Sequence, residues 1–187
     1  DFRWYVLVVG TAALAGVAWI LSPGWTTEDF LRFSGAPSLT PVLLVLYVLV
    51  VNGFGEEIGW RGLLAEHLLD TRSTLSTALV VGGVWAGWHL PLFWIVGNFR
   101  DLSPAGVTGW CVGILCGSVF LTWMYRSARH SVLIVALWHT AYNFTTATTA
   151  TAGTFAAVVS TAVIIAAVVI AAVPASRRSP REEPTSG

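Results

Sequence analysis

Residues 39–69 read LTPVLLVLYVLVVNGFGEEIGWRGLLAEHLL and contain the feature that decides the fold. The stretch opens with an apolar run that crosses most of a bilayer about 30 Å thick. It then continues to residue 69 without a further proline, and apolar positions recur there at helical spacing. We therefore predict one long helix that carries Glu56, Glu57 and Arg61 into the membrane.

The composition of the whole chain supports a membrane protein. Of its 187 residues, 55% are hydrophobic and only 11% are charged, and the mean hydropathy is +0.71. Such a chain has too little polar surface to coat a soluble globule, so its main partner is the lipid bilayer. The formal net charge is zero and no lysine is present. With no overall basic field, nucleic acid is not an expected partner.

Six apolar runs are long enough to cross a bilayer, at residues 4–21, 39–54, 75–96, 104–125, 132–149 and 152–173. We expect an all-α fold, a polytopic bundle of about six spanning helices that forms a single domain over residues 1–173. The polar tail, residues 174–187, cannot bury a core and is expected to be disordered. The chain begins with aspartate rather than methionine, so we expect that N-terminal helices are lacking from it.

The arginines predict how the bundle is oriented. In a six-span arrangement only Arg32 and Arg100 fall on one side, and Arg61 lies within the membrane. The remaining arginines fall on the other side, at positions 3, 72, 126, 129, 177, 178 and 181. Because cytoplasmic loops are enriched in arginine, both ends of the chain are expected in the cytoplasm.

Polar and ionisable residues inside apolar helices are the candidates for chemistry. Such groups cost several kcal/mol in a bilayer and usually face the bundle interior with a functional partner. The alternative is that they only bond neighbouring helices together. The set comprises Glu56, Glu57, Arg61, His89, His139 and Asn143.

Two roles are expected for the adjacent glutamates. Glu57 and Arg61 stand four residues apart with the acid first, which favours an ion pair on one helix face. Glu56 is turned about 100° away from that face, which leaves it free for general-base chemistry. Glycines at 53, 55 and 59 would let a neighbouring backbone approach it, and we expect a bend near the first two.

Two later helices each present a pair of residues on one face. Trp85 and His89 are four residues apart, and Pro91 interrupts helical hydrogen bonding just after the histidine. His139 and Asn143 have the same spacing, and donors placed in this way can hold an oxyanion or contribute to a metal shell.

Depth in the membrane allows these groups to meet. At 1.5 Å per residue, Glu56 lies about 21 Å and His89 about 22 Å from the cytoplasmic ends of their helices. Asn143 and His139 lie about 18 Å and 12 Å from the corresponding end of theirs. We therefore expect three helices to bring the polar set to one site.

The three motifs in this order resemble those of the CPBP intramembrane proteases, the CAAX-processing and bacteriocin-processing or Abi group. They are Glu-Glu-x-x-x-Arg at 56–61, aromatic-x-x-x-His at 85–89 and His-x-x-x-Asn at 139–143. The resemblance covers roughly residues 40–145, and the run at 56–62 is typical of bacterial members, which implies a bacterial cell membrane. Family members usually have phenylalanine where this chain has Trp85, and they often have more than six helices.

The resemblance implies roles for the candidate residues. Glu56 and His89 would activate the attacking water, while His139 and Asn143 would bind the oxyanion. Glu57 and Arg61 would form the supporting ion pair.

The resemblance also bears on cofactors, because the family is often labelled as metalloprotease. If zinc were used, Glu56, His89 and His139 would be its three ligands. No His-Glu-x-x-His motif is present, and we favour a glutamate-type mechanism without a cofactor.

The implied substrate is a membrane-associated peptide or protein, prenylated as in CAAX processing or not prenylated as in peptide maturation. A non-catalytic scaffold or bacteriocin-immunity protein with the same fold is the main alternative. A proton-relay transporter is a third, which the lack of an inverted repeat disfavours.

Overall fold

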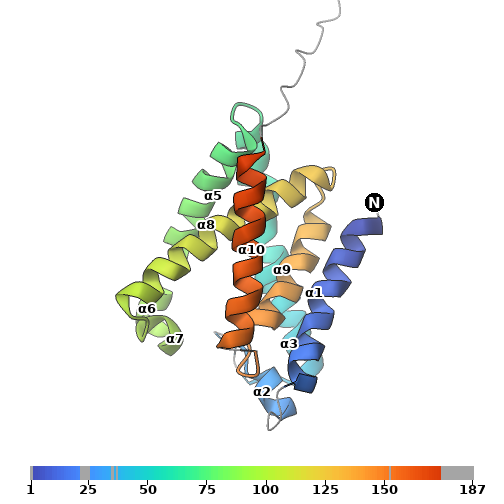
Figure 1. Ribbon diagram of the computed structural model, residues 1–187, viewed down its shortest axis with the longest axis vertical. Helices are drawn as coiled ribbons and strands as arrows, with labels where there is room; N and C mark the ends of the chain where they lie inside the picture. Colours follow the sequence, from blue (N-terminus) through green and yellow to red (C-terminus); the bar gives the residue numbers. More distant parts are fainter. Residues whose placement is uncertain (1, 22–25, 35, 37, 152, 174–187) are drawn as a thin grey trace, which may run out of the picture.

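The computed structural model describes residues 2–21, 26–34, 36, 38–151 and 153–173. Over this part of the chain the regular elements are helices, arranged as a bundle (Figure 1). The elements are α1 (Phe2–Leu21), α2 (Thr27–Leu31), α3 (Pro41–Tyr47), η1 (Val48–Gly55), η2 (Ile58–Ala65), α4 (Glu66–Leu69), α5 (Thr74–Trp88), α6 (Leu92–Ile95), α7 (Gly97–Arg100), α8 (Pro104–Ser127), α9 (Val132–Thr146) and α10 (Thr154–Ala172). The all-α prediction is confirmed; the tail at 174–187 lies outside the described residues.

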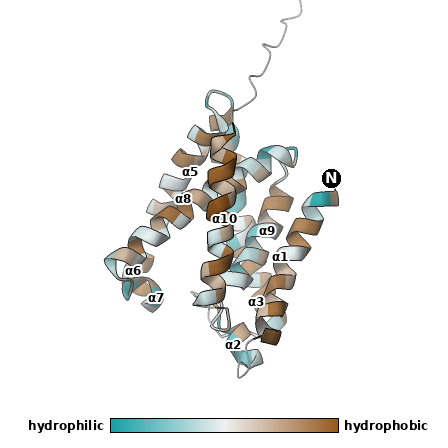
Figure 2. Ribbon diagram, viewed as in Figure 1, coloured by the Kyte–Doolittle hydropathy of each residue, from teal (hydrophilic) through white to brown (hydrophobic). Residues whose placement is uncertain are grey.

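Four helical segments are long and apolar enough to cross a membrane: Pro41–Leu69, Thr74–Ile95, Pro104–Ser127 and Thr154–Ala172. A shorter apolar helix covers Phe2–Ala18. Large hydrophobic side chains lie exposed along several of these helices, and Figure 2 shows hydrophobic colour over much of α1 and α10. An apolar exterior of this kind is what a lipid environment requires. The chain is therefore an integral membrane protein.

Four of the six expected spans thus have the length to cross a membrane, and α9 is shorter than its predicted run. α9 has 15 residues and ends at Thr146, whereas the apolar run continues to residue 149. The helix packs between α1, η1 and α10. The segment that follows it is hydrogen-bonded to the chain after α2, where Ser34 N donates to Ala147 O over 2.8 Å. The segment after Thr146 is covered by protein, so apolar residues continue in the sequence beyond the end of the helix.

The predicted long helix at 39–69 is confirmed from Pro41 to Leu69. Its middle is wider than an α-helix, because η1 and η2 are π-helical on either side of Glu56 and Glu57. Stretches of π-helix are rare and frequently mark functional sites. The two glutamates thus lie at the junction of two unusual turns.

The helix that carries His89 stops where the proline predicts. α5 ends at Trp88, and the amides of His89 and Leu90 bond to carbonyls only three residues back, over 3.1 Å each. This tightening precedes Pro91, which disfavours helical geometry in the residue before it. His89 therefore projects from the end of a helix, where the short helices α6 and α7 follow.

Close packing between helices depends on individual glycines. A Cβ at Gly53 would meet the backbone of Ala136 in α9 at 3.0 Å, and would also contact the Thr140 hydroxyl. Nothing lies within 4 Å of a Cβ at Gly59. The predicted close approach is thus confirmed at Gly53, where η1 meets α9, and is wrong at Gly59.

Candidate active site

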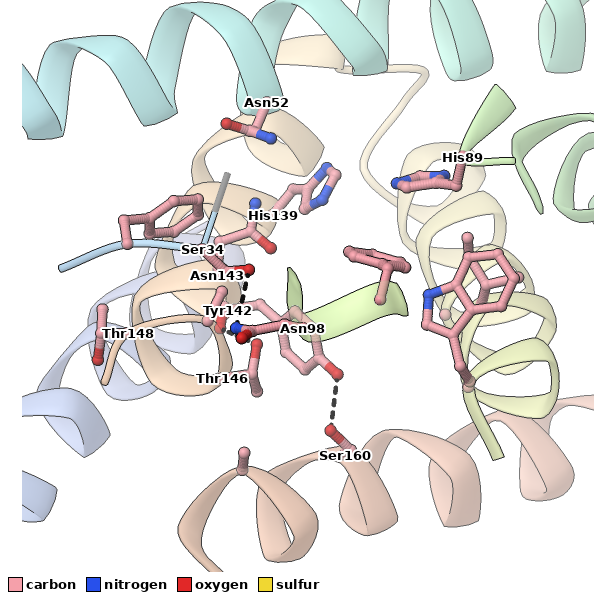
Figure 3. A pocket seen from close by; sticks show the side chains of 18 of the residues that line it. Ser34, Asn52, His89, Asn98, His139, Tyr142, Asn143, Thr146, Thr148 and Ser160 are labelled. Carbon is pink, nitrogen blue, oxygen red and sulfur yellow. Dashed lines mark hydrogen bonds between the residues drawn. The ribbon is translucent and has the colours of Figure 1, made fainter. Parts of the chain in front are cut away.

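A cavity of about 840 Å³ lies within the bundle and is lined by parts of η1, α5, α7, α8, α9 and α10. Its walls include Glu56, His89, His139 and Asn143, the four residues expected to carry chemistry. Figure 3 shows His89 and His139 on opposite sides of the open space, with Asn52 and Asn143 near His139. The three helices thus bring four of the six predicted polar residues to one cavity, and Glu57 and Arg61 are not among its lining residues.

Glu56 is held through both carboxylate oxygens. Asn52, one turn earlier, donates from Nδ2 to Oε1 over 3.4 Å, and Trp85 of α5 donates from Nε1 to Oε2 over 2.6 Å. The side chain is half-buried and lines the cavity. Its remaining lone pairs are available to a water molecule, as a general base requires.

His89 is fixed in one ring orientation by its own helix. Its Nδ1 lies 2.8 Å from the carbonyl oxygen of Trp85, which can only accept, so Nδ1 is the donor. In the neutral ring, Nε2 then carries the lone pair. The ring stacks on Phe99 with centroids 6.3 Å apart and meets Trp110 edge-on at 5.8 Å.

Glu57 is the buried centre of a charge network. Its Oε1 accepts a hydrogen bond from Arg61 Nη1 over 2.9 Å and another from His139 Nδ1 over 2.7 Å. Both members of the ion pair are fully buried. The Arg61 guanidinium also lies over the Trp85 ring, 5.0 Å from its centroid. The predicted pair therefore forms, and it also binds His139, which was expected to act together with Asn143.

Asn143 lies one turn after His139 in α9 and is half-buried in the cavity wall. Among the described residues its side-chain amide has no hydrogen-bond partner. An amide in this position can donate two hydrogen bonds to a ligand. Asn143 is thus the donor that remains available when His139 is bonded to Glu57.

A second cavity, of about 410 Å³, adjoins the first. Five residues line both, namely Phe33, Ser34, Asn52, Glu56 and His89. Glu56 and His89 thus lie where two hollows meet. An extended chain placed across this boundary would leave one flank on each side of the proposed base.

The zinc alternative requires three ligands around one point. Within the described ranges, no three side chains of His, Cys, Asp or Glu are grouped closely enough to hold one ion. Glu56, His89 and His139 are therefore not grouped as a ligand set in this structure.

Two features of the site were missed from the sequence. The Glu57–His139 bond joins residues 82 positions apart, and no local spacing signals such a contact. Trp85 touches Glu56, Arg61, His89 and His139. Its spacing from His89 placed it on the correct face, but nothing in the sequence indicated that its indole N–H points at Glu56.

Comparison with known proteins identifies the family. The chain is 26% identical over 117 residues to a protein of Methanococcus maripaludis named CAAX prenyl protease 2, covering 60% of this chain and 43% of that one. The chain thus spans less than half the length of this relative. No solved structure matches. The type II CAAX prenyl endopeptidase Rce1-like family matches residues 38–145, a range that includes every candidate residue. The resemblance seen in the motifs is confirmed, and the chain belongs to this family.

Proposed function

We propose that this chain is an intramembrane endopeptidase that hydrolyses a peptide bond near the membrane surface. The observation that carries the proposal is that Glu56, His89 and Asn143 line one cavity in a lipid-embedded bundle. Ionisable groups in such a setting are expensive and mark a functional site.

Glu56 and His89 activate the attacking water in this proposal. Glu56 accepts a proton as the water oxygen bonds to the carbonyl carbon of the substrate. The Nε2 lone pair of His89 accepts a second hydrogen bond and orients the water. When the carbon–nitrogen bond breaks, the proton held on Glu56 passes to the departing amine, which leaves a carboxylic acid and an amine.

Asn143 and His139 stabilise the charge that develops on the carbonyl oxygen. The free amide of Asn143 supplies a donor in the cavity wall, and a preorganised donor of this kind stabilises an oxyanion as it forms. His139 donates from Nε2 only when its ring carries both protons, because Nδ1 already donates to Glu57. We therefore assign Asn143 the larger share of oxyanion binding.

The substrate we propose is a membrane-associated peptide or protein, either a prenylated CAAX-type chain or a peptide that matures without a prenyl group. The relative is named a CAAX prenyl protease. Aromatic side chains beside His89, namely Phe93, Phe99 and Trp110, pack edge-to-face and form an apolar wall suited to a lipid-like group. By the arginine bias, the site would serve the cytoplasmic side.

The test is cleavage by purified protein in detergent, with a farnesylated CAAX-motif peptide and its unprenylated counterpart as probes. Glu56→Gln, His89→Ala and Asn143→Ala should each abolish or strongly reduce cleavage. Glu66→Gln is the matched control, because it makes the same change on the same continuous helix at an exposed position outside both cavities, where Glu66 bonds to Tyr125 and His130. Each form is assayed with and without EDTA.

The possible outcomes distinguish a glutamate-type protease from a non-catalytic protein and from a metal-dependent protease. Cleavage that requires Glu56 and resists EDTA supports the glutamate-type endopeptidase. If Glu56→Gln had the same biological activity as wild type, the proposal would be wrong. A non-catalytic scaffold or immunity protein would then be favoured. Loss of wild-type cleavage in EDTA, restored by added Zn²⁺, would contradict the metal-independent mechanism.

A further inference from the structure

Trp85 contacts the reacting groups on both sides of the proposed water. Its indole Nε1 donates to Glu56 Oε2, and its backbone carbonyl accepts from His89 Nδ1. The side chain is buried, with 7% of its surface exposed. One residue thus fixes the carboxylate through its ring and the histidine through its backbone.

The bond to Glu56 has the geometry of a charge-assisted hydrogen bond. Its donor–acceptor distance is 2.6 Å, shorter than the usual 2.9 to 3.0 Å of neutral N–H···O bonds. Bonds to ionised acceptors are shorter and stronger. The partner on the other oxygen, Asn52, is 3.4 Å away. Trp85 therefore contributes most to the carboxylate's orientation.

The ring of Trp85 is itself held in place. Its edge-on contacts with His89 and His139 have centroid distances of 5.8 and 5.5 Å, and Arg61 lies over its face. A phenyl ring keeps an aromatic face for these contacts but lacks the N–H. The donor to Glu56 is thus a property of tryptophan at this position.

We propose that Trp85 is a positioning residue for the reaction: its indole N–H orients the Glu56 carboxylate while its carbonyl orients His89. The inference rests on the proposed function, because it assumes that Glu56 and His89 activate water. Trp85 takes no proton and forms no bond to the substrate. It acts by keeping the base in the geometry for proton transfer, where small displacements cost rate.

The first test is kinetic and uses Trp85→Phe, which removes the donor and keeps an aromatic ring. We expect kcat to fall about 10-fold, the effect of losing one hydrogen bond to a charged group, with KM changed less than twofold.

Trp4→Phe is the control. Trp4 is equally buried, and its Nε1 has no acceptor among the described residues. It should keep wild-type kcat. Unchanged kcat in Trp85→Phe would overturn the proposal.

The second test needs no activity and stays decisive if Trp85→Phe fails to fold. In ¹⁵N-labelled protein, the indole N–H signal of Trp85 should lie downfield of the other tryptophan indoles and exchange slowly with solvent. Glu56→Gln should move it upfield, while the Trp4 signal stays unchanged. An indole signal identical in wild type and Glu56→Gln would refute the bond. If no form of the protein cleaved either peptide, the proposed function would fail, and this signal alone would decide whether Trp85 holds Glu56.

Discussion

His139 donates from Nδ1 to Oε1 of Glu57 over 2.7 Å, and this bond ties α9 to the long helix. The same oxygen accepts from Arg61, and the pair is fully buried. The network therefore belongs to the packing of the bundle as much as to its chemistry. Because His139 is part of this network, we expect its substitution to change stability and activity together.

Removing Arg61 should destabilise the protein strongly. Arg61→Met leaves Glu57 as a buried charge without its main partner, a change that costs about 3–5 kcal/mol in the free energy of unfolding. The measurement is unfolding by denaturant in mixed micelles. The control is Arg32→Met, which breaks a pair of the same i, i+4 spacing with Glu28 at 3.7 Å, where the side chains are 68% and 80% exposed. Exposed pairs contribute about 0–1 kcal/mol. Equal losses of unfolding free energy in the two variants would show that burial does not determine how much the Glu57–Arg61 pair contributes to stability.

Asn143 should separate activity from stability. Asn143→Ala removes the amide donor without adding a charge to the half-buried cavity wall. We expect kcat to fall by about 10²–10³-fold, as for the loss of an oxyanion donor. Stability should change by less than about 1 kcal/mol, because no described residue bonds this amide. Cleavage kinetics and denaturant unfolding of the same preparation check both. If the variant retained the wild-type kcat, Asn143 would not be a donor to the oxyanion.

Much of this arrangement follows from the sequence, for physical reasons. Hydrophobic length predicts the spanning helices, and i, i+4 spacing predicts the Glu57–Arg61 pair and the shared face of His139 and Asn143. The π-helical turns on either side of Glu56 and Glu57 could not be predicted, because the spacing of apolar residues does not distinguish a π-helical turn from an α-helical one.

Contacts between distant segments also had no sequence signal. The Glu57–His139 bond depends on how two helices rotate against each other. The shortened α9 depends on a loop that hydrogen-bonds the chain near Ser34. A shared helix face is readable from spacing, but the partner that this face meets is decided by tertiary packing.

The tautomer of His89 is a direct test of the site's electrostatics. With Nδ1 donating to the Trp85 carbonyl, the neutral ring should carry its proton on Nδ1 and leave Nε2 open to water. Two-bond ¹H–¹⁵N correlation spectra at alkaline pH distinguish the two neutral tautomers. The exposed His67 is the internal reference and should show the mixture of a solvated ring. A proton on Nε2 of His89 would mean that this nitrogen cannot accept a hydrogen bond from the attacking water.

Two glycines in one helix should respond in opposite ways. Gly53→Ala places a methyl group against the Ala136 backbone and the Thr140 hydroxyl, which should push η1 away from α9 and cost about 1–3 kcal/mol by overpacking. The same movement would separate Glu56 from Asn143, so cleavage should fall as well. Gly59→Ala meets nothing within 4 Å and should be neutral or stabilise by up to about 1 kcal/mol, since alanine favours helix. Unfolding and cleavage are measured on both variants. If Gly53→Ala were as stable and active as Gly59→Ala, the contact between η1 and α9 would not be what sets the geometry of the site.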